Sequence, residues 1–106
     1  MILVWVSSYL LTIALELPVL LLVFESVSRV RVILVGLLAT SLTHPVLWWV
    51  WPHVVSDYTT AILSGEVIIV VAETIVLRLG VGCGWRLAMA GSALANGTSM
   101  IVGSLY

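Results

Sequence analysis

The sequence predicts an all-α membrane protein, a single transmembrane domain over residues 1–106 with four transmembrane helices in an up-and-down bundle. Of its 106 residues, 62% are hydrophobic and 8% are charged, and the mean hydropathy is +1.27. Soluble domains carry about 25% charged residues. The apolar residues fall into four segments, each close to the roughly 20 residues that a helix needs to cross the hydrocarbon core. Short connections make consecutive helices antiparallel, which favours the up-and-down bundle.

The four segments run from about residue 3 to 24, 32 to 51, 60 to 79 and 86 to 105. Each is continuously apolar, whereas the strands of a membrane barrel alternate with period two. Between them lie "ESVSRVR", "PHVVSDY" and "GVGCGW", which have turn-like composition. The first segment lacks the basic start and the small-residue cleavage site of a signal peptide. We therefore expect it to be retained as the first helix.

The four arginines predict the orientation. Arg29 and Arg31 lie in the first connection, while Arg78 and Arg86 flank the third. The positive-inside rule places both connections in the cytoplasm and both termini on the non-cytoplasmic side. We thus expect a multi-pass protein of the cell inner (plasma) membrane, with the lipid bilayer as a partner. A net charge of −1 argues against nucleic acid as a partner.

Three tryptophans, Trp48, Trp49 and Trp51, follow each other closely in "HPVLWWVWP", at the outer end of the second segment. Tryptophan favours the headgroup level of a bilayer, which predicts an interfacial anchor. An aromatic platform for a ligand is the alternative interpretation.

Strongly polar residues interrupt all four segments, and we call this set the polar seam: Glu16, His44, Glu66, Glu73 and Asn96. At 1.5 Å per residue, all of them except Glu66 fall within roughly 5 Å of the bilayer midplane. Glu66 falls in the outer third of the core. It is seven residues from Glu73, so both glutamates share one helix face.

Small polar residues predict how the helices pack. They recur at helical spacing in the fourth segment and precede Pro45 in the second: Ser92, Asn96, Ser99 and Gly103, and Thr43. Such stripes let membrane helices approach closely and form hydrogen bonds across the contact. Pro45 removes an amide donor, which predicts a kink beside Thr43 and His44.

The cost of burying the carboxyl groups restricts where they can lie. One acidic residue at a helix centre costs about 2.5–3.5 kcal/mol, so three facing lipid would cost on the order of 8–10 kcal/mol. They must therefore face the bundle interior, a water-filled cavity or a partner subunit. A protonated glutamate with a hydrogen bond to Asn96, Thr43, His44 or another glutamate is the least costly arrangement.

Catalytic and metal chemistry find little support in these residues. A single cysteine, Cys83, excludes an intrachain disulfide and a multi-cysteine metal site. His44 together with two glutamates could hold a metal, but a lone intramembrane histidine is more often a hydrogen-bond donor between helices. No Ser-His-Asp arrangement is evident. We expect a non-enzymatic protein without cofactor or metal.

The motifs "ELP", "THP", the paired "GE" and "AE", and "SALANGTS" occur in the four segments in turn. In this pattern the chain resembles small uncharacterised four-helix bacterial inner-membrane proteins, a resemblance that implies no activity. In size, helix number and first-helix glutamate it is also similar in architecture to the small multidrug resistance transporters. That likeness implies a proton- and cation-binding role for Glu16 in a dimer. The two glutamates of the third segment depart from that family's pattern.

Two functional hypotheses follow. The first is an accessory or assembly subunit that packs through the polar seam, against itself or against other membrane protein subunits. The alternative is a proton-coupled transporter of a small solute or cation that works as an oligomer, with Glu16 and Glu73 as the titrating groups.

Overall fold

The structure, a computed structural model, describes residues 2–103, and every regular element in that range is helical. The elements in chain order are α1 (Ile2–Val23), α2 (Arg29–Pro45), a wide π-helical turn η1 (Val46–Val50), α3 (Trp51–Val54), α4 (Tyr58–Val81) and α5 (Trp85–Gly103). The described residues contain no strand. The predicted all-α fold is therefore confirmed.

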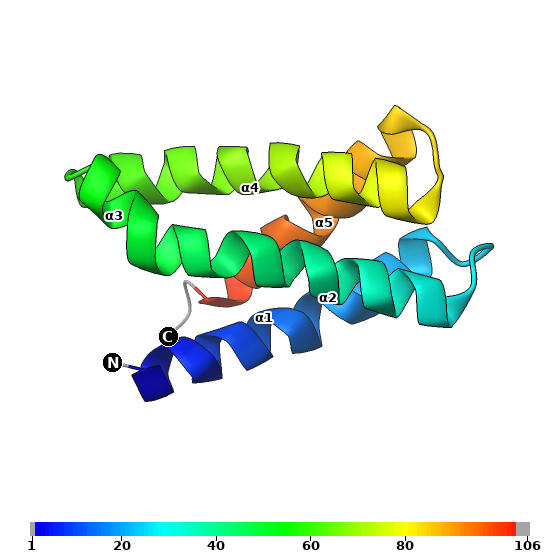
Figure 1. The fold of residues 1–106 in the computed structure, drawn as a ribbon, viewed down its shortest axis with the longest axis horizontal. Helices are drawn as coiled ribbons and strands as arrows, with labels where there is room; N and C mark the ends of the chain where they lie inside the picture. Colours follow the sequence, from blue (N-terminus) through cyan, green and yellow to red (C-terminus); the bar gives the residue numbers. More distant parts are fainter. Residues whose placement is uncertain (1, 104–106) are drawn as a thin grey trace.

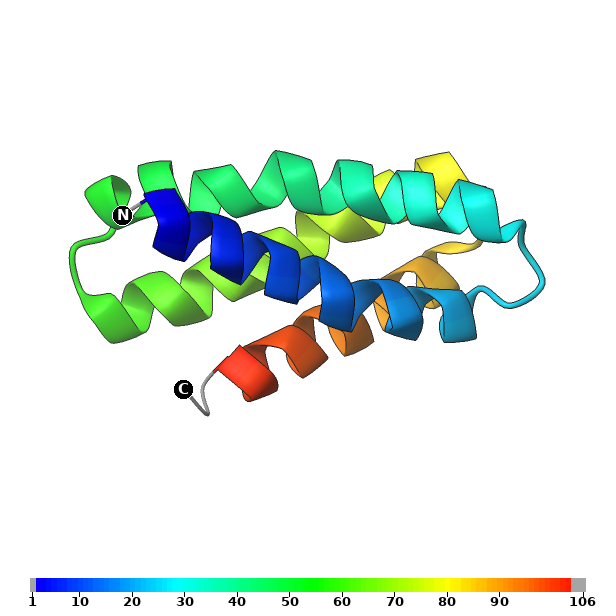
Figure 2. The same cartoon turned by 90° about the horizontal axis from the view of Figure 1, so that it is seen from below.

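The long helices α1, α2, α4 and α5 form a bundle in which consecutive members run antiparallel (Figure 1). Helix α1 packs against α2 and α5, and α4 packs against the same two. The order around the bundle is therefore α1, α2, α4, α5, with α1 and α4 on opposite sides. Seen from below, the start of α1 and the end of α5 lie toward the end that carries α3 (Figure 2). We call this the α3 end.

Three of the helices meet the length and composition needed to cross a membrane: Leu3–Val23, Arg29–Val50 and Thr59–Val81. Helix α5 forms where a fourth span is predicted, but it is not among these three. Arg86, Asn96 and several Ser, Thr and Gly residues lower its hydropathy. The molecule is 40 Å long, close to the 40–45 Å thickness of a bilayer with its headgroup regions.

The second helical segment is longer than predicted. It begins at Arg29 and continues through η1 and α3 to Val54, so that part of the expected connection "PHVVSDY" is helical. Pro45 cannot donate a backbone hydrogen bond, and the helix widens directly after it. The amide of Trp51 then donates to the carbonyl of Val46, five residues back. The predicted disturbance at Pro45 is therefore a widened turn.

Asp57 fixes the start of α4. Its carboxylate accepts hydrogen bonds from the backbone amide of Thr60, at 2.9 Å, and from the hydroxyl group of Thr60, at 2.7 Å. This is a standard N-terminal cap. The hydroxyl and then the backbone bond lower the pKa of Asp57 below its ordinary value.

The opposite end of the bundle carries all four arginines, and we call it the arginine end. The connection between α4 and α5 begins at Gly82, whose φ of 79° is a left-handed conformation that glycine adopts without steric cost. The Arg31 guanidinium donates to the carbonyl of Gly80 at 2.8 Å, which joins α2 to the last turn of α4. The Arg78 guanidinium lies 5.4 Å from the Trp85 ring centroid, a cation–π distance.

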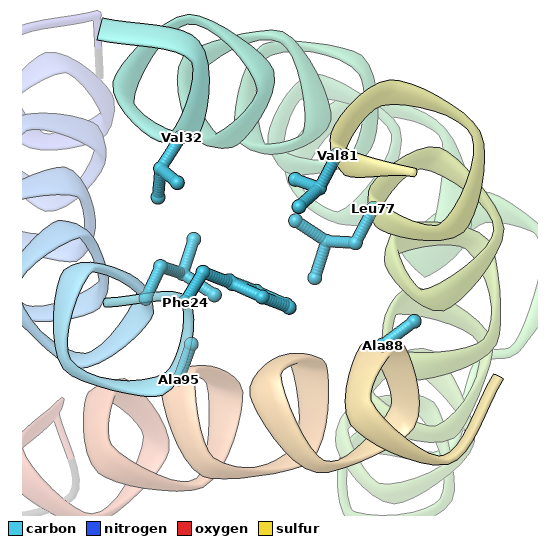
Figure 3. Packing of buried hydrophobic residues seen from close by; sticks show 7 residues of the cluster. Phe24, Val32, Leu77, Val81, Ala88 and Ala95 are labelled. Carbon is cyan, nitrogen blue, oxygen red and sulfur yellow. The ribbon is translucent and has the colours of Figure 1, made fainter. Parts of the chain in front are cut away.

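Buried apolar side chains close the arginine end, and we call them the apolar plug (Figure 3): Leu20, Phe24, Val32, Leu77, Val81, Ala88 and Ala95. Phe24 lies against Gly91, where a Cβ atom would approach the ring to 2.9 Å. Only glycine therefore permits this approach of α1 to α5. Outward-facing residues such as Leu3 and Leu22 are 81% and 76% exposed, as expected of side chains that contact lipid.

Candidate functional site

Glu16 of α1 is buried at the centre of the bundle, with 2% of its surface exposed. One carboxyl oxygen, Oε2, accepts a hydrogen bond from the hydroxyl group of Ser99 on α5, at 2.8 Å. The other, Oε1, accepts a longer one from Thr40 on α2, at 3.4 Å. The side chain therefore links its own helix to both neighbouring helices.

Glu73 of α4 has the corresponding position on the opposite side of the bundle and is 4% exposed. Its Oε1 accepts a hydrogen bond from the Asn96 amide of α5 at 3.1 Å, and its Oε2 accepts one from the Thr43 hydroxyl of α2 at 3.2 Å. Helices α2 and α5 thus each supply one donor to each carboxyl group.

We call these two glutamates and their donors the carboxyl centre: Glu16, Glu73, Thr40, Thr43, Asn96 and Ser99. All four donors are neutral. The two carboxyl groups also interact electrostatically with each other. Since the described residues bring no positive charge to this centre, a proton or an added cation has to neutralise the carboxylates when they are shielded from water.

A backbone contact fixes the orientation of the Asn96 amide. Its nitrogen donates to the carbonyl oxygen of Ser92 at 2.8 Å as well as to Glu73. A carbonyl oxygen can only accept, so the nitrogen must occupy this side of the amide group. The Ser92 hydroxyl in turn donates to the carbonyl of Val70 at 2.9 Å and joins α5 to α4.

A cavity of about 800 Å³ reaches the carboxyl centre from the α3 end. Its lining begins at Val55 and Ser56, in the connection that follows α3, and extends to Glu16, Glu73 and Asn96. The apolar plug lies beyond these residues, toward the arginine end. Among the described residues, the cavity therefore extends from the α3 end to the carboxyl centre, and the apolar plug lies between that centre and the arginine end.

Glu66 lies in the wall of this cavity, about two helical turns from Glu73. Among residues 2–103, no hydrogen bond connects its carboxyl group to another group of the protein, in contrast to Glu16 and Glu73. Glu66 interacts electrostatically with both of them. Apart from His44, the described lining contains no basic side chain, so the cavity is acidic.

His44 also lines the cavity, inside a cluster of aromatic rings: Trp5, Tyr9, Trp48 and Trp49. The Trp48 ring stacks on the imidazole at 6.0 Å, and the Tyr9 ring meets it edge-on at 5.5 Å. Two buried atoms of the cluster, His44 Nδ1 and Trp5 Nε1, have no hydrogen-bond partner among the residues that the structure describes. His44 thus makes ring contacts between α1 and α2, in place of the expected hydrogen bond between helices.

The three tryptophans of "HPVLWWVWP" point in different directions. Trp48 and Trp51 line the cavity, whereas Trp49 is 41% exposed. The Trp51 indole donates to the carbonyl of Ala61 at 3.1 Å and to the hydroxyl of Ser64 at 3.3 Å, which holds α3 against α4. An interfacial position remains a prediction for all three tryptophans. Gly103 ends the helix, and its surroundings lie outside the described residues.

Several site residues were not singled out from the sequence: Trp5, Tyr9, Ser8 and Thr12. Ser8 and Thr12 precede Glu16 at intervals of four residues and share its helix face. This spacing is the signal that could have found them. Tyr9 forms a hydrogen bond with the Ser41 hydroxyl and packs with Trp5 against α2; these contacts depend on a neighbouring helix, which no local pattern reveals.

Within the described part of the chain, no three His, Cys, Asp or Glu residues are grouped closely enough to hold a metal ion. No family model matches this chain, and no curated protein or solved structure is significantly similar to it.

Glu73 accepts hydrogen bonds, whereas Glu66 accepts none among the described residues. These two glutamates of α4 therefore give a matched test of how much the carboxyl centre stabilises the protein. Glu73→Leu should reduce the free energy of unfolding by about 1–3 kcal/mol, because it removes the acceptor of one buried N–H group of Asn96. Glu66→Leu should change it by less than about 0.5 kcal/mol. Reversible unfolding in mixed detergent micelles measures both. Equal losses in the two variants would show that the carboxyl centre contributes no special stability.

Proposed function

We propose that this chain is a proton-coupled transporter that binds organic cations in the cavity and exchanges them for protons at the carboxyl centre. The cavity carries the proposal, because it ends on two buried carboxyl groups, has a third in its wall and contains no arginine or lysine in its described lining. A carboxylate deep in a bundle can be neutralised by a proton or by a cation. Because the proton and the cation compete for the same carboxyl group, binding of one is coupled to release of the other.

The size of the cavity favours an organic ligand over a bare inorganic ion. At about 30 Å³ per water molecule, a volume of about 800 Å³ corresponds to roughly 25 waters. Sites for small molecules span about 300–1,000 Å³. An inorganic cation needs several oxygen ligands within about 2.6 Å of one point. Here the carboxyl oxygens already accept hydrogen bonds from four side chains.

The chemistry of the wall points to a cation with an apolar body. Trp48 and Trp51 contribute indole rings to the wall, and an indole face attracts a cation by about 0.5–2 kcal/mol. Leu47, Ile62 and Ile69 supply apolar surface between them and the carboxyl centre. An alkyl- or arylammonium ion satisfies both requirements.

Helix α5 completes the wall of this site, and we propose that it crosses the membrane as the fourth span. Its hydrogen bonds to Glu16 and Glu73 support this, because they join α5 to two helices that are long and apolar enough to span a membrane. The positive-inside rule then puts the arginine end in the cytoplasm and both termini outside. The cavity is accordingly accessible from the non-cytoplasmic side in this conformation.

Cys83, a free thiol in the connection between α4 and α5, reports this orientation. In intact cells a membrane-impermeant maleimide should leave Cys83 unlabelled, and permeabilisation should expose it. A Ser56→Cys, Cys83→Ser variant should show the opposite pattern, since Ser56 lies at the α3 end. Labelling of Cys83 from outside intact cells would reverse the proposed orientation.

Binding of a quaternary ammonium ion tests the function directly. Benzyltrimethylammonium should bind the purified protein in mild detergent, as measured by equilibrium dialysis. Its neutral isostere, neopentylbenzene, should bind much more weakly. Glu16→Gln or Glu73→Gln should weaken binding of the ammonium by about ten- to a hundredfold, the effect of losing roughly 1.4–2.7 kcal/mol. A lower pH should also weaken it, because protons compete for the same carboxyl groups.

Glu25→Gln is the control, because Glu25 is an exposed carboxyl in the connection between α1 and α2. It should leave the affinity unchanged. If the ammonium and its neutral isostere bind equally well, or if all three Gln variants behave alike, the cavity is not a cation site.

The assembly subunit expected from the sequence is the second candidate function, and the outward face of α5 favours it. Ala90 and Ala93 are exposed there, and a Cβ atom on Gly97 would meet nothing within 4 Å. Small residues of this kind allow close contact with another membrane helix. The carboxyl centre forms its hydrogen bonds within the chain, so docking would use this other face. If assembly is the only role of this chain, the ammonium probe should not bind.

A further inference from the structure

The Thr43 hydroxyl has a choice between two kinds of acceptor, a carboxyl oxygen and the backbone carbonyls of its own helix. It lies 3.2 Å from Glu73 Oε2 and 3.0 Å from the backbone carbonyl of Ala39. A hydroxyl group has one proton to donate and two lone pairs with which to accept. Thr43 can therefore donate to only one of the two at full strength, and its oxygen can accept at the same time.

Ser99 repeats this arrangement at the other carboxyl group. Its hydroxyl lies 2.8 Å from Glu16 Oε2 and 3.1 Å from the backbone carbonyl of Asn96. Both glutamates thus present one oxygen to a hydroxyl group that has a backbone carbonyl as its second acceptor.

The remaining oxygen of each carboxyl group receives a different kind of contact. Glu73 Oε1 faces the Asn96 nitrogen, which can only donate and whose orientation is fixed by Ser92. Glu16 Oε1 faces Thr40, for which no second acceptor is described. These oxygens accept hydrogen bonds in either charge state, which leaves Oε2 as the position for a proton.

We infer that Thr43 and Ser99 are positioning residues that reverse their hydrogen bonds when Glu73 and Glu16 gain or lose a proton. When the carboxyl group is ionised, the hydroxyl donates to Oε2. When a proton arrives from the cavity, it is held on Oε2 and donated to the hydroxyl oxygen, whose own proton turns to the backbone carbonyl. Both charge states then keep their hydrogen bonds, as proton exchange at a buried carboxyl group requires.

This inference rests on the proposed function and names the residues that couple its two ligands. The titratable groups that line the cavity beside the carboxyl centre are Glu66 from α4 and His44 from α2, and Tyr9 from α1 contacts His44. The described part of α5 presents only neutral side chains to it. Ser92 and Thr74 are not equivalent to Thr43, because their hydroxyls donate to the Val70 carbonyl and not to a carboxyl group.

Infrared spectroscopy of the purified protein without any cation tests the inference. The carbonyl stretch of protonated Glu73 is identified as the band that Glu73→Gln removes. In Thr43→Val this band should move to higher wavenumber, because the carboxyl proton loses its acceptor. In Thr43→Ser it should stay in place, because the hydroxyl group is retained. Ser99→Ala should move the band that Glu16→Gln removes, and it provides an independent measurement on α5.

Unmoved bands in Thr43→Val and Ser99→Ala would overturn the inference. So would the absence of any band assignable to protonated Glu16 or Glu73 at every pH at which the protein stays folded. Because no cation is present, a failure of the proposed cation binding would not alter this result. Conversely, if the bands do not move but the ammonium ion still binds, only the reversal of the hydrogen bonds is overturned and the proposed function stands.

Discussion

The burial of two carboxyl groups among neutral donors is the constraint on which the rest of this structure depends. Each costs about 2.5–3.5 kcal/mol against lipid, so each must be enclosed and supplied with hydrogen bonds. Glu16 and Glu73 stand on helices that face each other across the bundle, and α2 and α5 donate to both of them. Satisfying the pair therefore fixes the order and the depth of all four long helices.

This constraint divides the molecule into two unequal halves. On one side of the carboxyl centre, Phe24 packs with its apolar neighbours, and the arginines lie at that end. On the other side, a cavity of about 800 Å³ runs toward the α3 end, between tryptophan and carboxyl side chains. A layer that only held helices together would need no such access. This cavity is the reason why we favour a site for cations over a purely structural role.

Much of the fold follows from residue patterns, because lipid imposes length and polarity on each segment. The boundaries of the long helices agree with expectation to within a few residues, apart from the added length of α2 and α3. Glu16, Glu73 and Asn96 could be placed together by depth alone. The inward orientation of Trp48 and Trp51 could not be predicted from the sequence, because the widened helical turn after Pro45 changes the phase of the helix. The ring contacts of His44 depend on which face α1 presents, and that is decided by tertiary packing.

Proton release on cation binding tests the central claim most directly. Benzyltrimethylammonium added to the weakly buffered protein in detergent should release on the order of one proton per bound cation, as charge balance at the carboxyl centre requires. A pH-sensitive dye measures the release, and the double variant Glu16→Gln, Glu73→Gln should abolish it. Binding without proton release, or the same release from the double variant, would contradict the coupling of cation and proton at these two glutamates.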